Sequence, residues 1–229
     1  MFDRFKLLIG DKINDIYNKT VLVIGLGGVG SYVCESLVRS GIGNIILVDY
    51  DKIDITNLNR QLMTLQSNVG LYKADVLKDR ILDINPECKV KVVKEFIDSN
   101  NLESLFCDHV DYVVDACDSV STKKDIIRYC LKNKIKFISC MGTANKLDPS
   151  KLSICDVRKT SYDPLAKIIR KMVKDEKLNG KVMVVSSTEV PIKTGSKTLG
   201  SCAFVPSVAG LLCTSYIIND IVGDCVEKD

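Results

Sequence analysis

The chain of 229 residues contains no two cysteines at the Cys-x-x-Cys spacing, and His109 is its only histidine. Structural zinc sites are built from cysteine pairs and imidazoles, so a zinc site is not expected. The first twelve residues, MFDRFKLLIGDK, carry too many charges for the apolar core of a secretory signal. We therefore expect the ten cysteines to be free thiols in a reducing compartment, and the protein to be cytoplasmic.

Long hydrophobic runs are also scarce. One apolar stretch, residues 204–222, approaches the length of a transmembrane helix. Polar residues and a proline interrupt this stretch, so it is predicted to be a buried helix that closes the fold, and no membrane span is expected. The interrupting residues are Pro206, Ser207, Thr214, Asn219 and Asp220.

The chain has little excess charge, no internal repeat and no low-complexity tract. Its formal net charge is +3, and its composition excludes the disordered and fibrous classes. The charge is uneven, because residues 146–200 hold twelve Lys and Arg against six Asp and Glu. This basic region is compatible with a polyanionic substrate and equally with a solvated lysine-rich surface.

Residues 21–61 carry the strongest signal in the chain. Residues 21–24 and 45–48 are apolar runs typical of buried parallel strands. Between them lie the glycine turn GLGGVG, which lets a phosphate approach the backbone, and a helix that we expect Ser31 to cap. Asp49 stands 19 residues beyond the last of these glycines, where a ribose-binding acid is expected. These features predict a nucleotide site, and a nicotinamide dehydrogenase remains one of the alternatives.

The remaining segments predict an α/β fold of the Rossmann type. Further strands are expected at residues 90–93, 112–114, 135–139, 152–157 and 182–185. Alternation of strands and helices predicts a mostly parallel sheet with helices on both faces. After residue 150 this alternation becomes irregular, which predicts a C-terminal extension of the sheet. We expect one domain, 1–229, with an N-terminal helical arm (1–19), a nucleotide-binding core (20–149) and a substrate-facing part (150–229).

Polar side chains cluster where the strands of this sheet should end. The loop after the second strand carries Asn57, Arg60 and Gln61, which can donate hydrogen bonds to a triphosphate. Gly70 is expected to open the next helix. Lys73 stands in the first turn of that helix, where it opposes the helix dipole, and this favours a functional role. Asp118 follows the fourth strand, and its carboxylate is either a magnesium ligand or a helix cap.

Several motifs, taken together, resemble a known family. GLGGVG, LVDYD, NLNRQ, Lys73 and DACDS resemble the adenylating domain shared by ubiquitin-activating E1 enzymes and ThiF/MoeB-like proteins. RSGIGNIILVDYD, INPECKV, CMGTANKLDP, KTSYDPLAK and GSCAFVPSVAGL are similar to the TcdA (CsdL/YgdL) family of tRNA threonylcarbamoyladenosine dehydratases. The resemblance extends from Phe2 to about Val222.

The resemblance implies a site for ATP and Mg²⁺. Arg60, Lys73 and Asp118 would be catalytic, and Asp118 would bind the magnesium ion. Arg4 would reach the nucleotide of the partner in a homodimer. The residues implied in ATP binding are Gly25, Gly27, Gly28, Gly30, Asp49, Asp51, Asn57, Arg60, Gln61, Lys73, Asp118 and Ser119.

The implied reaction is ATP-dependent cyclisation, with net loss of water, of N6-threonylcarbamoyladenosine at position 37 of tRNA. The resemblance also implies a cysteine desulfurase and its sulfur acceptor as partners. Cys140 follows a strand at the ligand edge of the sheet, so it is either a reactive thiol or an inert buried residue. Activation of a ubiquitin-like sulfur carrier by E1-like adenylyl transfer is the alternative function, against which the missing zinc cysteines argue. The basic residues expected to face the RNA are Lys146, Lys159, Lys167, Arg170 and Lys171.

Overall fold

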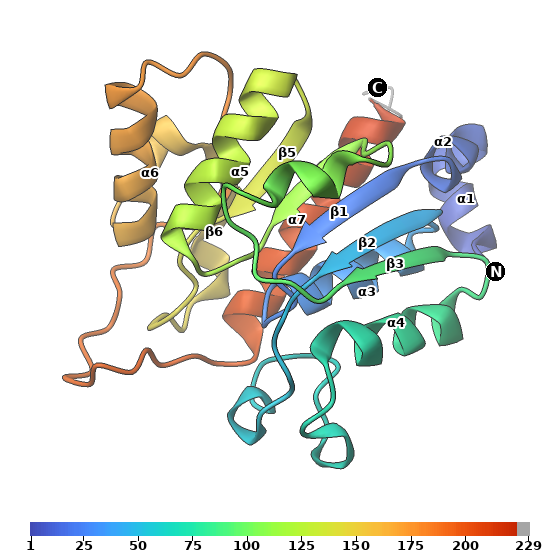
Figure 1. Ribbon diagram of the computed structural model, residues 1–229, viewed down its shortest axis with the longest axis horizontal. Helices are drawn as coiled ribbons and strands as arrows, with labels where there is room; N and C mark the ends of the chain where they lie inside the picture. The colour runs from blue at the N-terminus through green and yellow to red at the C-terminus, as the bar shows by residue number, and fades with distance from the viewer. Residues whose placement is uncertain (224–229) are drawn as a thin grey trace.

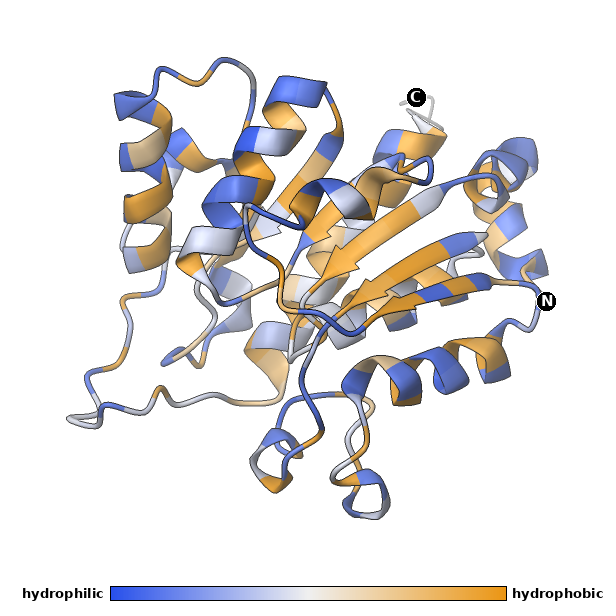
Figure 2. Ribbon diagram, viewed as in Figure 1, coloured by the Kyte–Doolittle hydropathy of each residue, from blue (hydrophilic) through white to orange (hydrophobic). Residues whose placement is uncertain are grey.

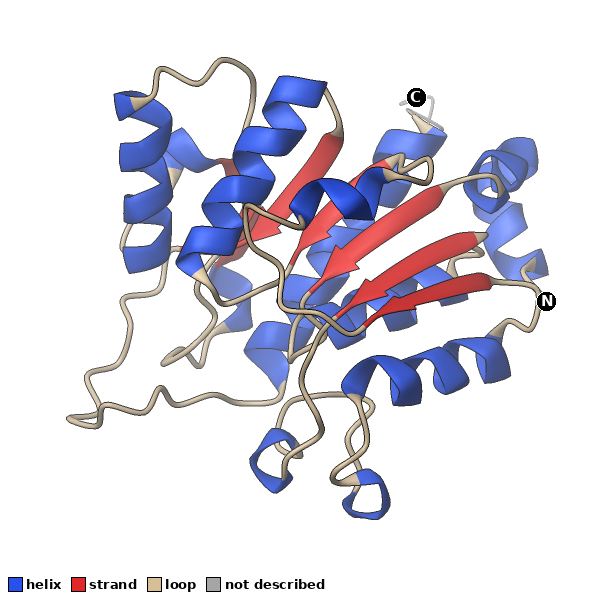
Figure 3. Ribbon diagram, in the orientation of Figure 1, coloured by secondary structure: helices blue, strands red, loops and turns tan. Residues whose placement is uncertain are grey.

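A single sheet of seven strands forms the centre of the molecule (Figures 1 and 3). The computed structural model describes residues 1–223, so Cys225 and the end of the predicted 150–229 part lie outside the described residues. The strand order is β3-β2-β1-β4-β5-β7-β6, and neighbours are parallel except for β6, which runs antiparallel to β7. The predicted mostly parallel sheet with a C-terminal extension is confirmed. The strands are β1 (Thr20–Ile24), β2 (Asn44–Val48), β3 (Lys89–Val93), β4 (Tyr112–Asp115), β5 (Lys136–Cys140), β6 (Leu152–Asp156) and β7 (Met183–Ser187).

Helices cover both faces of the sheet and bury a separate hydrophobic core on each. In β1, Val21 and Val23 belong to the core beneath α2, α3, α4 and α7, whereas Leu22 and Ile24 belong to the core beneath α5 and α6. A strand buried on both faces is therefore apolar along its buried part, as Figure 2 shows for β1 beyond its first residue. The helices are α1 (Asp3–Ile9), α2 (Ile13–Tyr17), α3 (Gly30–Arg39), α4 (Lys73–Ile84), α5 (Val120–Asn133), α6 (Pro164–Asp175) and α7 (Phe204–Val222). Short 3-10 helices are η1 (Gly10–Lys12), η2 (Ile55–Asn57), η3 (Gln66–Asn68), η4 (Leu102–Phe106), η5 (Pro149–Lys151) and η6 (Val157–Lys159).

Helix α7 is the predicted closing helix. Among the described residues it is the one helix that is long and apolar enough to cross a membrane by length and composition, and half of its apolar window is buried inside the fold. It crosses behind the sheet (red in Figure 1) and packs against α3. At Gly210 a Cβ atom would lie 2.5 Å from the carbonyl oxygen of Val29, so glycine permits the close approach of the two segments. This packing confirms the interpretation as a core helix.

Two helix starts differ from the prediction. Ser31 does not cap α3: the helix begins at Gly30 with Val29 as N-cap, and the buried Ser31 hydroxyl accepts a hydrogen bond from Leu62 N–H instead. No side chain caps α3, which suits a helix end that faces a ligand anion. The helix expected to open at Gly70 begins at Lys73, because residue 70 has a φ of 90° and lies in a turn ahead of it.

Candidate active site

A cavity of about 440 Å³ opens at the edge of the sheet where the parallel strands end. Side chains from the glycine turn, the loop after β2, the start of α4 and the β4–α5 turn line it. The carboxyl edge of an open α/β sheet is the usual place for a ligand site. The predicted ATP-binding residues that line the cavity are Gly25, Gly27, Gly28, Asp49, Asp51, Asn57, Arg60, Gln61, Lys73, Asp118 and Ser119.

The glycine turn packs so tightly that side chains are excluded from two of its positions. Gly25 has a φ of 87°, and a Cβ there would lie 2.7 Å from the carbonyl oxygen of Ala116. Gly30 does not line the cavity, but a Cβ on it would lie 1.8 Å from the carbonyl oxygen of Gly25. These two glycines let the turn fold onto itself and onto the end of β4, and they leave the uncapped start of α3 at the cavity.

Three charged groups connect the glycine turn to α4. The carboxylate of Asp49 accepts hydrogen bonds from Leu26 N–H at 2.7 Å and from Asp51 N–H at 2.9 Å. Burial raises the pKa of Asp49, and the positive charge of Lys73 opposes that shift. Lys73 is only 5% exposed, and its ammonium lies 2.6 Å from the carboxylate of Asp51. The carboxylate of Asp51 thus offsets the unfavourable interaction of Lys73 with the helix dipole, and the ammonium of Lys73 stays at the cavity wall.

The loop after β2 supplies two further polar side chains to the cavity. Arg60 donates through Nη1 to the carbonyl oxygen of Thr56 and to Oδ1 of Asn59, which fixes its orientation. Gln61 is 6% exposed, and its Oε1 is buried without a hydrogen-bond partner. An unsatisfied buried amide is costly, so Gln61 is suited to hydrogen-bond a ligand in this cavity.

Asp118 is an exposed carboxylate on the cavity wall, and it is not the helix cap. Ser119 caps α5, because its hydroxyl accepts from Thr122 N–H. The described residues contain no cluster of three or more metal-ligating side chains. Mg²⁺ does not require such a cluster, because it is commonly held by one or two carboxylates together with substrate phosphates and waters. Asp118 fits that role.

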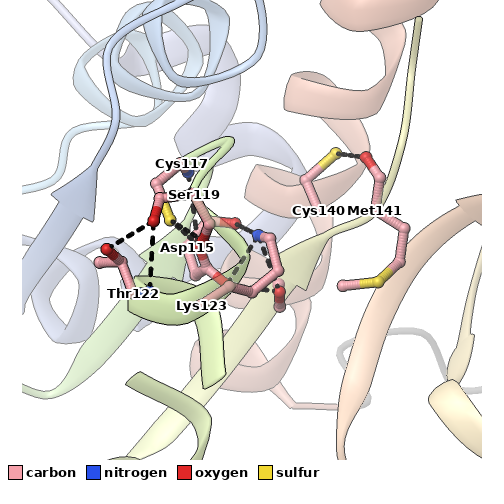
Figure 4. Close-up of polar contacts among 8 residues, drawn as sticks. Asp115, Cys117, Ser119, Thr122, Lys123, Cys140 and Met141 are labelled. Atoms are coloured by element: carbon pink, nitrogen blue, oxygen red, sulfur yellow. Dashed lines mark hydrogen bonds and ion pairs between the residues drawn. The ribbon is translucent and has the colours of Figure 1, made fainter. Parts of the chain in front are cut away.

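A buried ion pair lies directly behind the β4–α5 turn (Figure 4). Asp115 and Lys123 are both fully buried, with 2.8 Å between Nζ and Oδ2, and Lys123 also donates to Oγ of Ser139 at 3.2 Å. The backbone N–H of Cys117 donates to Oδ1 of Asp115. Burial acts to lower the pKa of Lys123, but the charge of Asp115 raises it above its ordinary value. The pair ties α5 to β4 and β5, and so supports the turn that carries Asp118.

Several lining residues were missed by reasoning from the sequence. Tyr50 and Phe96, whose rings meet edge to face with centroids 5.4 Å apart, line the cavity where β2 and β3 end. Leu199, Gly200 and Ser201 reach it from the segment between β7 and α7. Tyr50 and Phe96 each follow a predicted strand, and nothing else in the sequence indicated that they line the cavity. The glycines, lysines and proline of residues 189–200 predict a loop that is mobile or crosses over the site, which hinted at Leu199 and Gly200. Only the tertiary structure shows that these two residues and Ser201 line the cavity.

The structure separates the remaining predicted site residues. Lys146 is wrong as an RNA-facing residue: it is 2% exposed, and its ammonium donates to the carbonyl oxygen of Gly142 at 2.7 Å and pairs with the buried Asp163 at 3.3 Å. Lys159, Lys167 and Lys171 are exposed, and Arg170 is half-buried. Arg4 is exposed on α1 and does not line the cavity of its own chain.

Cys140 is buried in the core on the α7 side of the sheet and does not line the cavity. Its thiol donates to the carbonyl oxygen of Met141 (Figure 4), and its hydrogen bond with Cys213, together with burial, raises the pKa of Cys213. A nucleophilic cysteine needs access and a stabilised thiolate. The structure therefore favours the inert alternative for Cys140.

Thiol labelling tests this placement. Among the cysteines that the structure describes, iodoacetamide at neutral pH is expected to modify the exposed Cys107 first and to leave Cys140 unmodified until the protein is unfolded. Cys130 should also stay unmodified, because burial raises its pKa to about 12. The measurement is mass analysis of peptides after timed labelling with and without denaturant. Rapid labelling of Cys140 in the folded protein would restore it as a reactive thiol.

The comparisons with known proteins agree with this geometry. The chain is 43% identical to the tRNA threonylcarbamoyladenosine dehydratase of Bacillus subtilis (strain 168), over 99% of this chain and 96% of the relative. It superimposes with a TM-score of 0.92 on the E. coli tRNA N6-threonylcarbamoyladenosine dehydratase, TcdA, in complex with ATP, at 35% identity over 100% of this chain and 96% of that one. The AMP complex of the same E. coli enzyme gives a TM-score of 0.91 at 36% identity, over 96% of this chain and 93% of that one. The ThiF family model matches residues 4–222, and the chain belongs to the ThiF family.

Proposed function

We propose that this protein is an ATP-dependent tRNA threonylcarbamoyladenosine dehydratase, which closes a ring on N6-threonylcarbamoyladenosine at position 37 of tRNA. The observation that carries the proposal is the cavity, in which Arg60, Lys73 and Asp118 meet the glycine turn. The relative from Bacillus subtilis with that activity aligns over nearly the whole chain. A hydride-transferring enzyme would need none of these three side chains around its nucleotide.

The chemistry requires activation of the threonyl carboxylate. An oxygen of that carboxylate attacks the α- or the γ-phosphorus of ATP, pyrophosphate or ADP respectively leaves with the electron pair of the broken P–O bond, and a mixed anhydride forms. A ureido atom of the same nucleoside then attacks the activated carbonyl carbon, and the phosphorylated oxygen departs with its electron pair. Because the nucleophile is intramolecular, the ring closes without a protein thiol, which agrees with the burial of Cys140.

The positively charged side chains act on the phosphates. Negative charge develops on the leaving phosphate oxygens, and Arg60 and Lys73 would stabilise it from positions fixed by their protein partners. Gln61 and the backbone N–H groups at the start of α3 would bind the phosphates and fix their position. Magnesium, when bound at Asp118, would neutralise phosphate charge.

The exposed side of α6 offers a surface for the tRNA backbone. A groove of about 780 Å³ lies along α6 and the loop that follows it, and its charged lining has six basic residues against one acid. Phosphate contacts of this kind supply sequence-independent affinity that weakens as salt concentration rises. We propose this groove in place of the buried Lys146. Its charged residues are Arg158, Lys167, Arg170, Lys171, Lys174, Asp175 and Lys177.

We propose a homodimer as the working assembly. Arg4 lies on α1 and not at the cavity of its own chain, so it could meet a nucleotide only in a second copy. The same helix exposes Leu7 (86%) and Leu8 (74%), which such a contact would cover. A cysteine desulfurase and its sulfur acceptor are further proposed partners. Cytoplasmic location is proposed on the cysteine content.

The central test is mass analysis of tRNA nucleosides. Wild-type protein with ATP and Mg²⁺ is expected to convert the threonylcarbamoyl nucleoside to a product lighter by one water. Asp118→Ala should lower the rate by about 100-fold or more, because it removes the magnesium ligand. Asp83→Ala, which removes an exposed carboxylate of α4 outside the cavity, is the matched control. An unchanged nucleoside mass with the wild-type protein would refute the proposed function.

A further inference from the structure

The segment between β7 and α7, residues 188–203, forms one wall of the cavity without any helix or strand of its own. Figure 3 shows it as the long tan connection that reaches the start of α7. Leu199, Gly200 and Ser201 line the cavity, whereas every residue from 193 to 200 is exposed. A segment with so little burial has low local stability, so its hydrogen bonds to the rest of the fold decide its position. We call residues 188–203 the crossover segment.

Asn145 makes three hydrogen bonds to the crossover segment. Its backbone N–H donates to the carbonyl oxygen of Gly200 at 2.8 Å, and its Oδ1 accepts from Gly200 N–H at 2.7 Å. Its carbonyl oxygen accepts from Ile192 N–H at 2.8 Å. Asn145 also has a φ of 57°, a left-handed conformation that asparagine tolerates better than most residues. One residue thus holds the crossover segment at two points, eight residues apart.

Asn59 holds the same segment from the opposite wall. Its Nδ2 donates to the carbonyl oxygen of Ser201 at 3.0 Å, and its Oδ1 accepts from Nη1 of Arg60 at 2.8 Å. Neither Asn59 nor Asn145 lines the cavity. Between them they join three walls: the loop after β2, the loop after β5, which contributes Thr143 and Ala144, and the crossover segment.

We propose that Asn145 and Asn59 are positioning residues that clamp the crossover segment across the mouth of the cavity. The clamp shapes the side of the site that receives the threonyl carboxylate, and Asn59 connects it to the phosphate-binding Arg60. This inference rests on the proposed dehydratase function. Within residues 1–223, none of the hydrogen bonds of Asn145 runs to a residue assigned to ATP binding, so the loss of this side chain should affect tRNA more than ATP. Loss of Asn59 should affect both tRNA and ATP, because this residue contacts Arg60 as well as the crossover segment.

Steady-state kinetics with tRNA bearing N6-threonylcarbamoyladenosine separate these roles. Asn145→Gly keeps the left-handed backbone but removes the side-chain acceptor, and it is expected to raise the KM for tRNA about fivefold, the effect of one lost hydrogen bond, with the KM for ATP unchanged. Asn59→Ala is expected to raise both KM values. Asn18→Gly is the matched control, because Asn18 is an exposed asparagine ahead of β1 whose side chain makes a single hydrogen bond within the described part of the chain, donated to the carbonyl oxygen of Asn14.

Hydrogen exchange gives a readout that does not depend on activity. Peptides covering residues 188–203 should exchange faster in Asn145→Gly than in the wild type, and Asn145→Asp, which keeps the acceptor and tolerates the left-handed conformation, should restore slow exchange. Wild-type exchange together with wild-type KM values in Asn145→Gly would overturn the clamp. Inactivity of the wild-type enzyme on this tRNA, with the exchange difference present, would refute the proposed function and leave the clamp supported.

Discussion

Replacing Lys73 by methionine is expected to lower kcat/KM by about 100- to 1000-fold, the loss typical of a single preorganised charge at a reaction centre. Lys73 is 5% exposed, so its charge acts in a site from which most water is excluded. Methionine reproduces the length of the buried stem but not the ammonium. Asp51, the ion-pair partner, keeps a side chain that is 46% exposed and can be solvated after the change. The fold should therefore survive.

The measurement is the rate of formation of the cyclised nucleoside as the ATP concentration varies, beside the unfolding temperature of each variant. Lys78→Met is the matched control, since Lys78 lies on the same helix but does not line the cavity. It should retain wild-type kinetics. Equal activity of Lys73→Met and wild type, at equal stability, would contradict the role of Lys73 at the phosphates.

Replacing Lys123 by methionine is expected to destabilise the protein by about 3–5 kcal/mol, the cost of leaving a buried carboxylate without its partner. Lys123 and Asp115 have no exposed surface, and the ammonium of Lys123 also donates a hydrogen bond to Oγ of Ser139. Asp115 raises the pKa of Lys123 although burial acts to lower it. The stabilisation by the charged Lys123 is therefore fully present at every pH below the ordinary pKa of lysine. It is lost only as pH rises through the raised pKa, in strongly alkaline solution.

Urea unfolding at neutral pH measures the free energy of unfolding of each variant. The double variant Asp115→Asn, Lys123→Met removes both charges and should recover most of the stability lost in Lys123→Met. Lys124→Met is the control, because Lys124 is the neighbouring lysine of α5 and only half-buried. A loss in Lys123→Met no larger than that of the control would contradict the expected cost of leaving the buried Asp115 carboxylate without its partner.

Much of the cavity follows from short-range patterns in the chain. Gly25 and Gly30 are required by turn geometry, and Asp49 follows an apolar strand, so each can be placed from the residues beside it. The unfavourable position of Lys73 in the first turn of a helix also marked it as functional, and the structure places it at the cavity. Parallel pairing then brings the ends of β1, β2 and β4 to one edge.

The prediction that Ser31 caps α3 was wrong, because it used only the preference of serine for the N-cap position. The helix starts two residues earlier than a cap at Ser31 implies, with Val29 as its N-cap, and Gly30 allows the backbone of Gly25 to pass. Lys146 was misplaced for a related reason: its charge suggested exposure, but Asp163, 17 residues later, provides a buried partner for it.

The sequence by itself determined the order of strands and helices, the glycine turn and the polar side chains that are expected to bind phosphate, because each depends on neighbours a few residues away. The tertiary structure decided which charges are buried in pairs, as for Asp115 with Lys123, and where the crossover segment lies. Asn59 reaches Ser201 across 142 residues of chain. Contacts of that separation depend on how the whole sheet and both helical layers pack, which no local pattern encodes.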